Sequence, residues 1–172
     1  MGFLLNLLGP DQIPLAPEMP VITTVMTPVN ISNIRSGAML SIPVKKLILK
    51  LGERCLFCDY GVRITEKLCI VDRHGNGFGA SFRICKGLTW HMGTRDTQQV
   101  RDKIPEYTKG KLYITNKRII FSSDSKAFQR KIDTLISYRI EENCLIIQFS
   151  NAAYKIYLPV ADCAEKVIEY IV

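Results

Sequence analysis

The sequence predicts a mainly β fold, an antiparallel barrel or sandwich followed by a C-terminal amphipathic helix. The last residues, from Pro159 onward, place apolar side chains on one helical stripe, and we expect this helix to close an open mouth or face of the sheet. Short apolar runs separated by turn residues recur regularly in the second half of the chain. They are Lys111–Thr115, Arg118–Ser122, Ala127–Ile132, Ile136–Ile140, Leu145–Phe149 and Tyr154–Leu158.

Further strands are expected between Val44 and residue 92, where apolar and polar residues mix at a period near two. The candidate runs are Lys45–Leu51, Arg54–Tyr60, Val62–Val71, Ser81–Cys85 and Leu88–Met92. Lys86 and Gly87 suit a two-residue hairpin turn between the last two runs. Residues 95–109 are polar and contain Pro105, so we expect a long connection there.

Residues 1–43 are predicted to form a proline-rich extended arm, and residues 44–172 the domain itself. Six of the eight prolines lie in the arm, and because proline fixes φ and removes a backbone donor, long helices and central strands do not fit there. The arm is also richer in apolar residues than a disordered tether. We therefore expect it to pack against the barrel or against a neighbouring subunit.

The segment from Gly110 to Phe121 reads Gly-Lys-Leu-Tyr-Ile-Thr-Asn-Lys-Arg-Ile-Ile-Phe. As a hairpin it would place Leu112 and Ile114 on one face and Lys111 and Tyr113 on the other, with the turn at residues 115–116. It resembles the signature hairpin of GRAM-like and bacterial pleckstrin-homology-like domains. The resemblance covers roughly residues 50–172.

This resemblance implies a pleckstrin-homology-like barrel closed by the terminal helix. It also implies a binding module for lipid headgroups or proteins, without catalytic residues. Residues 62–109 offer more strand than the seven strands of such a barrel require, so we expect an inserted hairpin or a distorted sheet in this region.

The net charge of +7 is unevenly distributed along the chain. Residues 44–140 carry +11, whereas residues 1–43 carry −1 and residues 141–172 carry −3. A basic body favours acidic partners such as phospholipid headgroups, nucleic acid or an acidic protein face, although it also suits an ordinary solvated surface. The candidate residues for an anionic headgroup are Lys111, Lys117, Arg118, Lys126, Arg130 and Lys131. Lys117 and Arg118 also belong to the hairpin signature.

The sequence offers little for catalysis or for a cofactor. His74 and His91 sit in no recognisable catalytic motif, so we expect no enzyme activity and no cofactor. Cys55 and Cys58 form a Cys-X-X-Cys pair and are weak metal candidates, because the other four cysteines are scattered singly. In a regular strand these two side chains would point to opposite faces, which favours buried reduced thiols.

The sequence thus favours a cytoplasmic bacterial binding or assembly module that contacts proteins, or copies of itself, through the apolar arm and the barrel surface. The alternative is peripheral binding to anionic lipid headgroups at the inner face of the membrane through basic residues of the barrel. Small zinc-binding and nucleic-acid-binding proteins rank below both, since no aromatic stacking platform is evident. No stretch reaches the roughly 18 apolar residues needed to span a bilayer, and six cysteines without a secretion signal favour a reducing compartment.

Overall fold

The computed structural model describes residues 17–72, 80–85, 88–92 and 99–172, with side chains described for residues 17–67 and 104–172. The chain divides into two compact units. One contains Pro17–Thr65 and Pro105–Val172, and the other contains the described residues of Glu66–Ile104.

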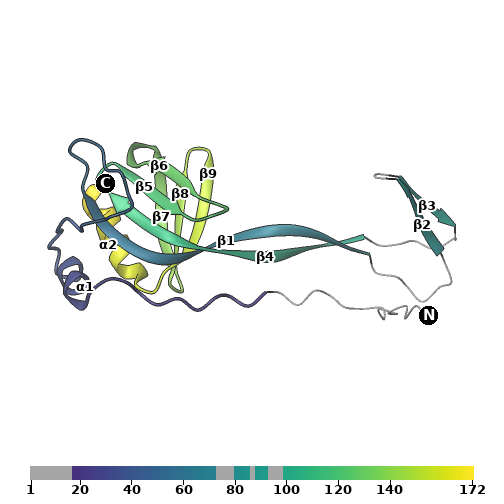
Figure 1. Cartoon of the computed structure of the whole chain (residues 1–172), viewed down its shortest axis with the longest axis horizontal. Helices are drawn as coiled ribbons and strands as arrows, with labels where there is room; N and C mark the ends of the chain where they lie inside the picture. Colours follow the sequence, from purple (N-terminus) through teal and green to yellow (C-terminus); the bar gives the residue numbers. More distant parts are fainter. Residues whose placement is uncertain (1–16, 73–79, 86–87, 93–98) are drawn as a thin grey trace. The chain divides into compact units, whose positions relative to one another are not determined.

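The larger unit is built on one antiparallel sheet (Figure 1). Within the described residues it has seven strands in the order β6-β5-β4-β1-β9-β8-β7. Their bounds are β1 Cys55–Asp72, β4 Gln99–Thr115, β5 Arg118–Ser122, β6 Phe128–Lys131, β7 Leu135–Glu141, β8 Cys144–Phe149 and β9 Ala152–Tyr157. A 3₁₀ turn, η1 (Ile132–Thr134), links β6 to β7, and the helix α2 (Ala161–Ile171) ends the chain.

Seven antiparallel strands of the described chain, followed by a terminal helix, confirm the predicted mainly β fold class. One detail of that prediction is wrong, because the sheet does not close into a barrel: β6 and β7 are edge strands, with no ladder between them in the described chain. The reason is local. Strand β6 has four residues and passes directly into η1, whose first amide donates to the carbonyl of Lys117.

The β4–β5 hairpin alternates as its sequence predicts. Leu112 pairs with Phe121 and Ile114 with Ile119, and all four side chains are fully buried in the main core. Gly110 is required because a Cβ there would lie 2.5 Å from the carbonyl oxygen of Ser122 and 2.6 Å from the Phe121 ring. The glycine of the signature therefore allows Phe121 to pack flat against β4.

Helix α2 covers the core through one apolar face. Its buried residues are Ala161, Cys163, Ala164, Val167 and Ile168. Val160 and Ile171, which the sequence placed on the same stripe, are partly buried against the same core. Burying such a stripe stabilises the domain by several kcal/mol, at about 1.5–3 per large side chain.

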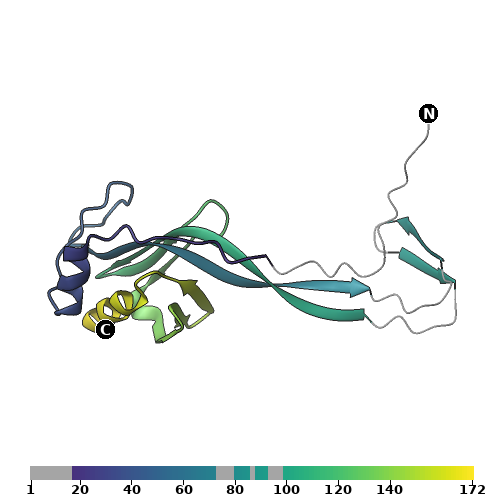
Figure 2. The same ribbon diagram turned by 90° about the horizontal axis from the view of Figure 1, so that it is seen from below.

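The described part of the arm, residues 17–43, contains a short helix, α1 (Pro28–Arg35), and packs on the same core as the sheet. Thr27 caps the start of α1 by accepting from the amide of Asn30. The helix ends in a Schellman motif, with Gly37 at φ +86° donating to the carbonyl of Ile34. Met26 and Ile34 are 7% and 3% exposed. Figure 2 shows α1 beside α2, so this part of the arm packs against the domain.

Two local predictions are wrong. Residues 95–109 are not simply a connection, because β4 begins at Gln99 and runs through Pro105. Residues 45–51 form a loop and not a strand. There the backbone carbonyls bond to side chains of the β4–β5 turn instead of to a neighbouring strand.

The smaller unit contains an antiparallel hairpin of β2 (Ala80–Cys85) and β3 (Leu88–Met92), in which Phe82 pairs with Trp90. This hairpin lies between β1 and β4 in the sequence and confirms the predicted insertion. The turn residues Lys86 and Gly87, and the glycine-rich segment with His74, lie outside the described residues.

Candidate functional site

The turn of the signature hairpin holds a neighbouring loop of residues 44–54, which we call the basic loop. Asn116 donates to the carbonyl of Gly52 at 3.1 Å and accepts from the amide of Arg54 at 2.8 Å. The ammonium group of Lys117 donates to the carbonyl of Leu51 at 2.7 Å. The polar residues of the turn therefore fix the loop that precedes β1.

Arg118 completes this anchor through a buried ion pair with Glu53. Its Nε lies 2.7 Å from Glu53 Oε1 and its Nη2 lies 3.0 Å from Oε2. A second bond from Nη2 reaches the carbonyl of Ile48 at 2.7 Å. Arg118 is 8% exposed, and a buried guanidinium with these partners is a structural group that is not free to bind a headgroup.

The ion pair also controls the ionisation of Glu53. Burial alone favours the neutral acid, but hydrogen bonds from Arg118, the amide of Lys50 and the hydroxyl of Thr115 outweigh it. Together they lower the pKa of Glu53 to about 2. Glu53 is therefore a carboxylate at any physiological pH.

The structure gives the six predicted headgroup residues different neighbours. Lys117 and Arg118 bind the basic loop, and Lys131 is an exposed residue on β6 opposite Arg118. The ammonium group of Lys111 lies 4.6 Å from the centre of the Tyr60 ring on the outer face of the sheet. A common headgroup site for all six remains a prediction from the sequence.

Lys126 and Arg130 both lie near Arg63, which was not among the predicted headgroup residues. Arg63 on β1 donates to the carbonyl of Lys126 at 2.6 Å, and its guanidinium carbon lies 5.0 Å from the Tyr154 ring centre. Arg130 donates to the Tyr154 hydroxyl at 3.0 Å, and Lys126 forms an ion pair with Glu106 at 2.6 Å. The alternation of β1 could have identified Arg63, because Gly61, Arg63 and Thr65 lie on one face of the strand. Arg63 pairs there with Ile156, which belongs to the main core.

Cys55 and Cys58 lie on the same face, not on opposite faces as a regular strand predicts. Both pack around Tyr113 and Ile120 on the outer side of the sheet. Leu56 and Phe57 are both in the main core, so the alternation breaks between them. Burial raises the pKa of Cys55 to about 12 and also raises that of Cys58, which keeps both as thiols. No three His, Cys, Asp or Glu side chains of the described chain lie close enough to share a metal ion.

Asp59 joins the arm to β1. It is fully buried, and its Oδ1 accepts from the amides of Val25 and Tyr60, each at 2.8 Å. Burial raises the pKa of this carboxyl, although the bonds from Val25, Thr24 and Tyr60 oppose the shift. Asp59 is therefore a buried acid whose position fixes the course of the arm.

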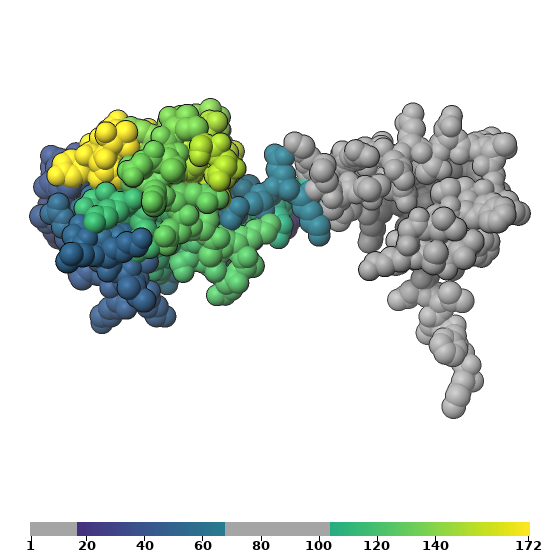
Figure 3. All heavy atoms as spheres, turned by 90° about the horizontal axis from the view of Figure 1, so that it is seen from above, coloured from purple at the N-terminus to yellow at the C-terminus, as the bar shows by residue number. Residues whose placement is uncertain are grey.

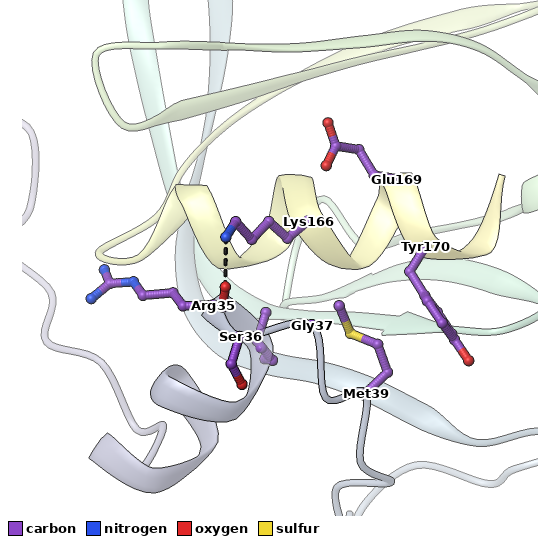
Figure 4. Close-up of a pocket in the computed structure, with 8 residues that line it drawn as sticks. Arg35, Ser36, Gly37, Met39, Lys166, Glu169 and Tyr170 are labelled. Atoms are coloured by element: carbon purple, nitrogen blue, oxygen red, sulfur yellow. Dashed lines mark hydrogen bonds between the residues drawn. The ribbon is translucent and has the colours of Figure 1, made fainter.

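An open cleft of about 390 Å³ lies where the arm meets α2, and we call it the arm–helix cleft. Figure 4 shows Arg35 and Ser36 at one end and Met39 and Tyr170 at the other. The ammonium group of Lys166 donates to the carbonyl of Arg35 at 2.7 Å, and Arg35 forms an ion pair with Asp162 at 2.7 Å. The remaining lining residues are Ile34, Gly37 and Glu169.

The arm–helix cleft offers a partner both apolar and polar contacts. Ile34 is buried and Met39 partly buried, while the Tyr170 ring is 60% exposed. Glu169 and Lys166 supply one charge of each sign. A site with an exposed aromatic ring, a thioether and mixed charges is suited to holding a protein side chain, and it contains no nucleophile–base pair.

Comparisons with known proteins give little more. No family model matches the chain, and no curated protein matches it. Among solved structures, the chain is similar to the N-terminal PH domain of Vps36, with 15% sequence identity and a TM-score of 0.40. The match covers 72% of this chain and 85% of that one. None of the helices in the part of the chain that the structure describes is long and apolar enough to cross a membrane.

Proposed function

We propose that this protein is a non-catalytic binding or assembly module that holds a protein partner in the arm–helix cleft. The carrying observation is the cleft itself, which is built jointly by the apolar arm and the last helix of the domain. The sequence already singled out the arm and the domain surface as the seat of a protein interaction. The narrower GRAM-like and bacterial assignments belong to this proposal and rest on the hairpin from Gly110 to Phe121, and the cytoplasmic assignment rests on the six cysteines.

The chemistry of the cleft supports a protein partner over a small molecule. A small-molecule site buries most of its ligand in an enclosed apolar pocket, whereas this cleft is open and more polar than apolar. Tyrosine and methionine are enriched where proteins meet, because they give large contact areas and adapt to a partner's shape. A partner would therefore insert an apolar side chain beside Met39 and Tyr170 and place polar groups near Lys166 and Glu169.

The test compares Tyr170→Ser with Ile136→Ser, a matched change at another exposed apolar residue, which is 63% exposed on β7. Self-association of each purified full chain is measured by light scattering, and proteins that copurify with each are quantified by mass spectrometry. We expect an interaction that Tyr170→Ser removes and Ile136→Ser leaves intact. If neither self-association nor any copurifying protein depends on Tyr170, the proposal is wrong.

A further inference from the structure

The basic loop exposes two large apolar side chains at fixed positions. Ile48 is 89% exposed and Leu51 is 97% exposed. Figures 2 and 3 show this segment, in blue, projecting from the sheet. Single exposed apolar residues are common, but two that project almost fully from one short loop mark a surface that meets another apolar phase.

The loop holds this shape by hydrogen bonds. Arg118 binds the carbonyl of Ile48, and Lys117 binds that of Leu51, each at 2.7 Å. The Glu53 amide donates to the carbonyl of Lys50 at 2.9 Å, and Gly52 takes φ +70° to complete the turn. Val44 and Leu47 pack on the outer face of the sheet. The two tips are therefore presented on a rigid frame, which lowers the entropy lost on binding.

The loop that carries the two tips is also rich in cations. Lys45, Lys46, Lys50 and Arg54 are exposed residues of the loop itself, and Lys117 lies against it. Its one acid, Glu53, is buried and paired with Arg118. None of these five cations forms an ion pair with another residue that the structure describes.

We propose that the basic loop docks on the surface of an anionic lipid bilayer. Ile48 and Leu51 enter the boundary between headgroups and acyl chains, while the lysines lie against lipid phosphates and carboxylates. This inference goes beyond the protein-binding function proposed above, because it uses a different surface and a different ligand. It also differs from the headgroup site predicted in the barrel, since of those six residues it uses Lys117 alone as a charge.

The composition of the surface favours a bilayer over an acidic protein face. The core of a protein–protein interface is depleted in lysine and enriched in arginine and aromatic residues, whereas four of these five cations are lysines. Long lysine stems can lie along an apolar phase while their charges stay in water. Two aliphatic tips on a loop with exposed lysines therefore match a fluid anionic surface.

The experiment measures cosedimentation of the full-length chain with phosphatidylcholine vesicles and with vesicles that also contain phosphatidylserine, at low and high salt. We expect binding to the anionic vesicles alone, weakened by salt. Ile48→Ser combined with Leu51→Ser should weaken it on the order of 100-fold, and Lys45→Gln combined with Lys46→Gln by about 30-fold. Ile136→Ser and Lys155→Gln, at exposed residues of β7 and β9, are the matched controls and should bind as the wild type does.

Insertion is tested separately with Leu51→Trp, whose emission should shift to the blue on anionic vesicles after subtraction of the wild-type signal from Trp90. The proposal is overturned if the chain does not bind anionic vesicles. It is also overturned if the Ile48 and Leu51 double variant binds as well as Ile136→Ser. Binding without a blue shift would equally refute it, because it would show that the lysines contact the anionic surface while the two tips stay in water.

Discussion

Arg118 on β5 lies opposite a residue of β6 that serves as its control in a substitution experiment. Arg118 and Lys131 are opposite each other in the β5–β6 register, and both were candidates for a headgroup site. Their environments differ completely, because Arg118 is buried against Glu53 whereas Lys131 is exposed. The same charge on the same face of the sheet is structural at one position and solvated at the other.

Arg118→Ala is expected to lower the free energy of unfolding by about 3–5 kcal/mol, because Glu53 would remain as an unpaired buried carboxylate. Lys131→Ala should change it by no more than about 0.5 kcal/mol, as is usual at an exposed position. Urea unfolding followed by circular dichroism measures both. Equal effects of the two substitutions would show that the ion pair does not anchor the basic loop.

Glu53 gives the protein a defined acid sensitivity. Its folded pKa of about 2 lies below the ordinary value of 4.5, so the folded state holds the carboxylate more strongly than the unfolded state does. The stabilisation is complete above pH 4.5 and is lost as the pH falls from there toward 2. In this window the wild type should lose more stability than Glu53→Gln, as measured by unfolding at a series of pH values. Parallel curves for the two proteins would contradict this.

The pKa of Asp59 is shifted in the opposite direction, so its contribution to stability changes with pH in the opposite sense. Burial raises its folded pKa above the ordinary 3.8, so the folded state binds this proton more strongly than the unfolded state does. The contribution to stability is greatest below pH 3.8 and declines as the pH rises through the raised pKa. Asp59→Asn keeps an acceptor for the amide of Val25 and should remove this decline. A pH profile of unfolding identical to that of the wild type would show that Asp59 does not titrate as described.

At the scale of the element, the β4–β5 hairpin depends on the missing side chain of Gly110. Gly110→Ala would place a Cβ 2.5 Å from the Ser122 carbonyl and 2.6 Å from the Phe121 ring, so the two strands must move apart. We expect a loss of about 1–3 kcal/mol of stability, as for other overpacked positions. Lys109→Ala, at the exposed neighbouring position, is the control. Thermal unfolding of both variants measures the difference, and a stable Gly110→Ala protein would mean that the strands yield easily.

The elements also show where sequence periodicity is a reliable guide. The hairpin β4–β5 was predicted from its strand alternation and turn residues, and the helix α2 from an apolar stripe that the structure buries. The loop at residues 45–51 has no strand period, since Leu47 packs on the sheet whereas Ile48 and Leu51 point into solvent. An apolar run forms a strand only where a neighbouring strand can pair with it. Here the side chains of residues 117 and 118 donate hydrogen bonds to backbone carbonyls of the loop instead.

For the whole molecule, the arm is expected to be part of the folding unit. Met26→Ala and Ile34→Ala remove side chains from the common core and should each cost about 2–5 kcal/mol. Val21→Ala, at an arm residue that is 90% exposed, should cost no more than about 0.5 kcal/mol. Urea unfolding monitored at the domain provides the measurement. If all three variants unfold like the wild type, the arm contributes nothing to the stability of the domain, whose predicted boundary at residue 43 would then gain support.

The sequence alone determined the features that depend on residues close to one another along the chain. Alternation, turn residues and the helical stripe predicted the antiparallel sheet, the signature hairpin, the inserted hairpin and the terminal helix. These features follow from which side chains one segment must bury. The arm's apolar composition likewise predicted that it would pack and not remain a tether.

Tertiary structure decided which charged and apolar side chains are available for binding. Arg118 is separated from Glu53 by 65 residues and Arg63 from Lys126 by 63, so neither pairing is visible in any local pattern. The arm–helix cleft joins residues 34–39 to residues 166–170, and the exposure of Ile48 and Leu51 depends on the turn at residues 115–118. Local periodicity sets which face of a segment is buried, but the fate of a charge depends on the partner that folding brings to it. For that reason the sequence predicted the scaffold, and the packing of distant segments decided which surfaces are exposed.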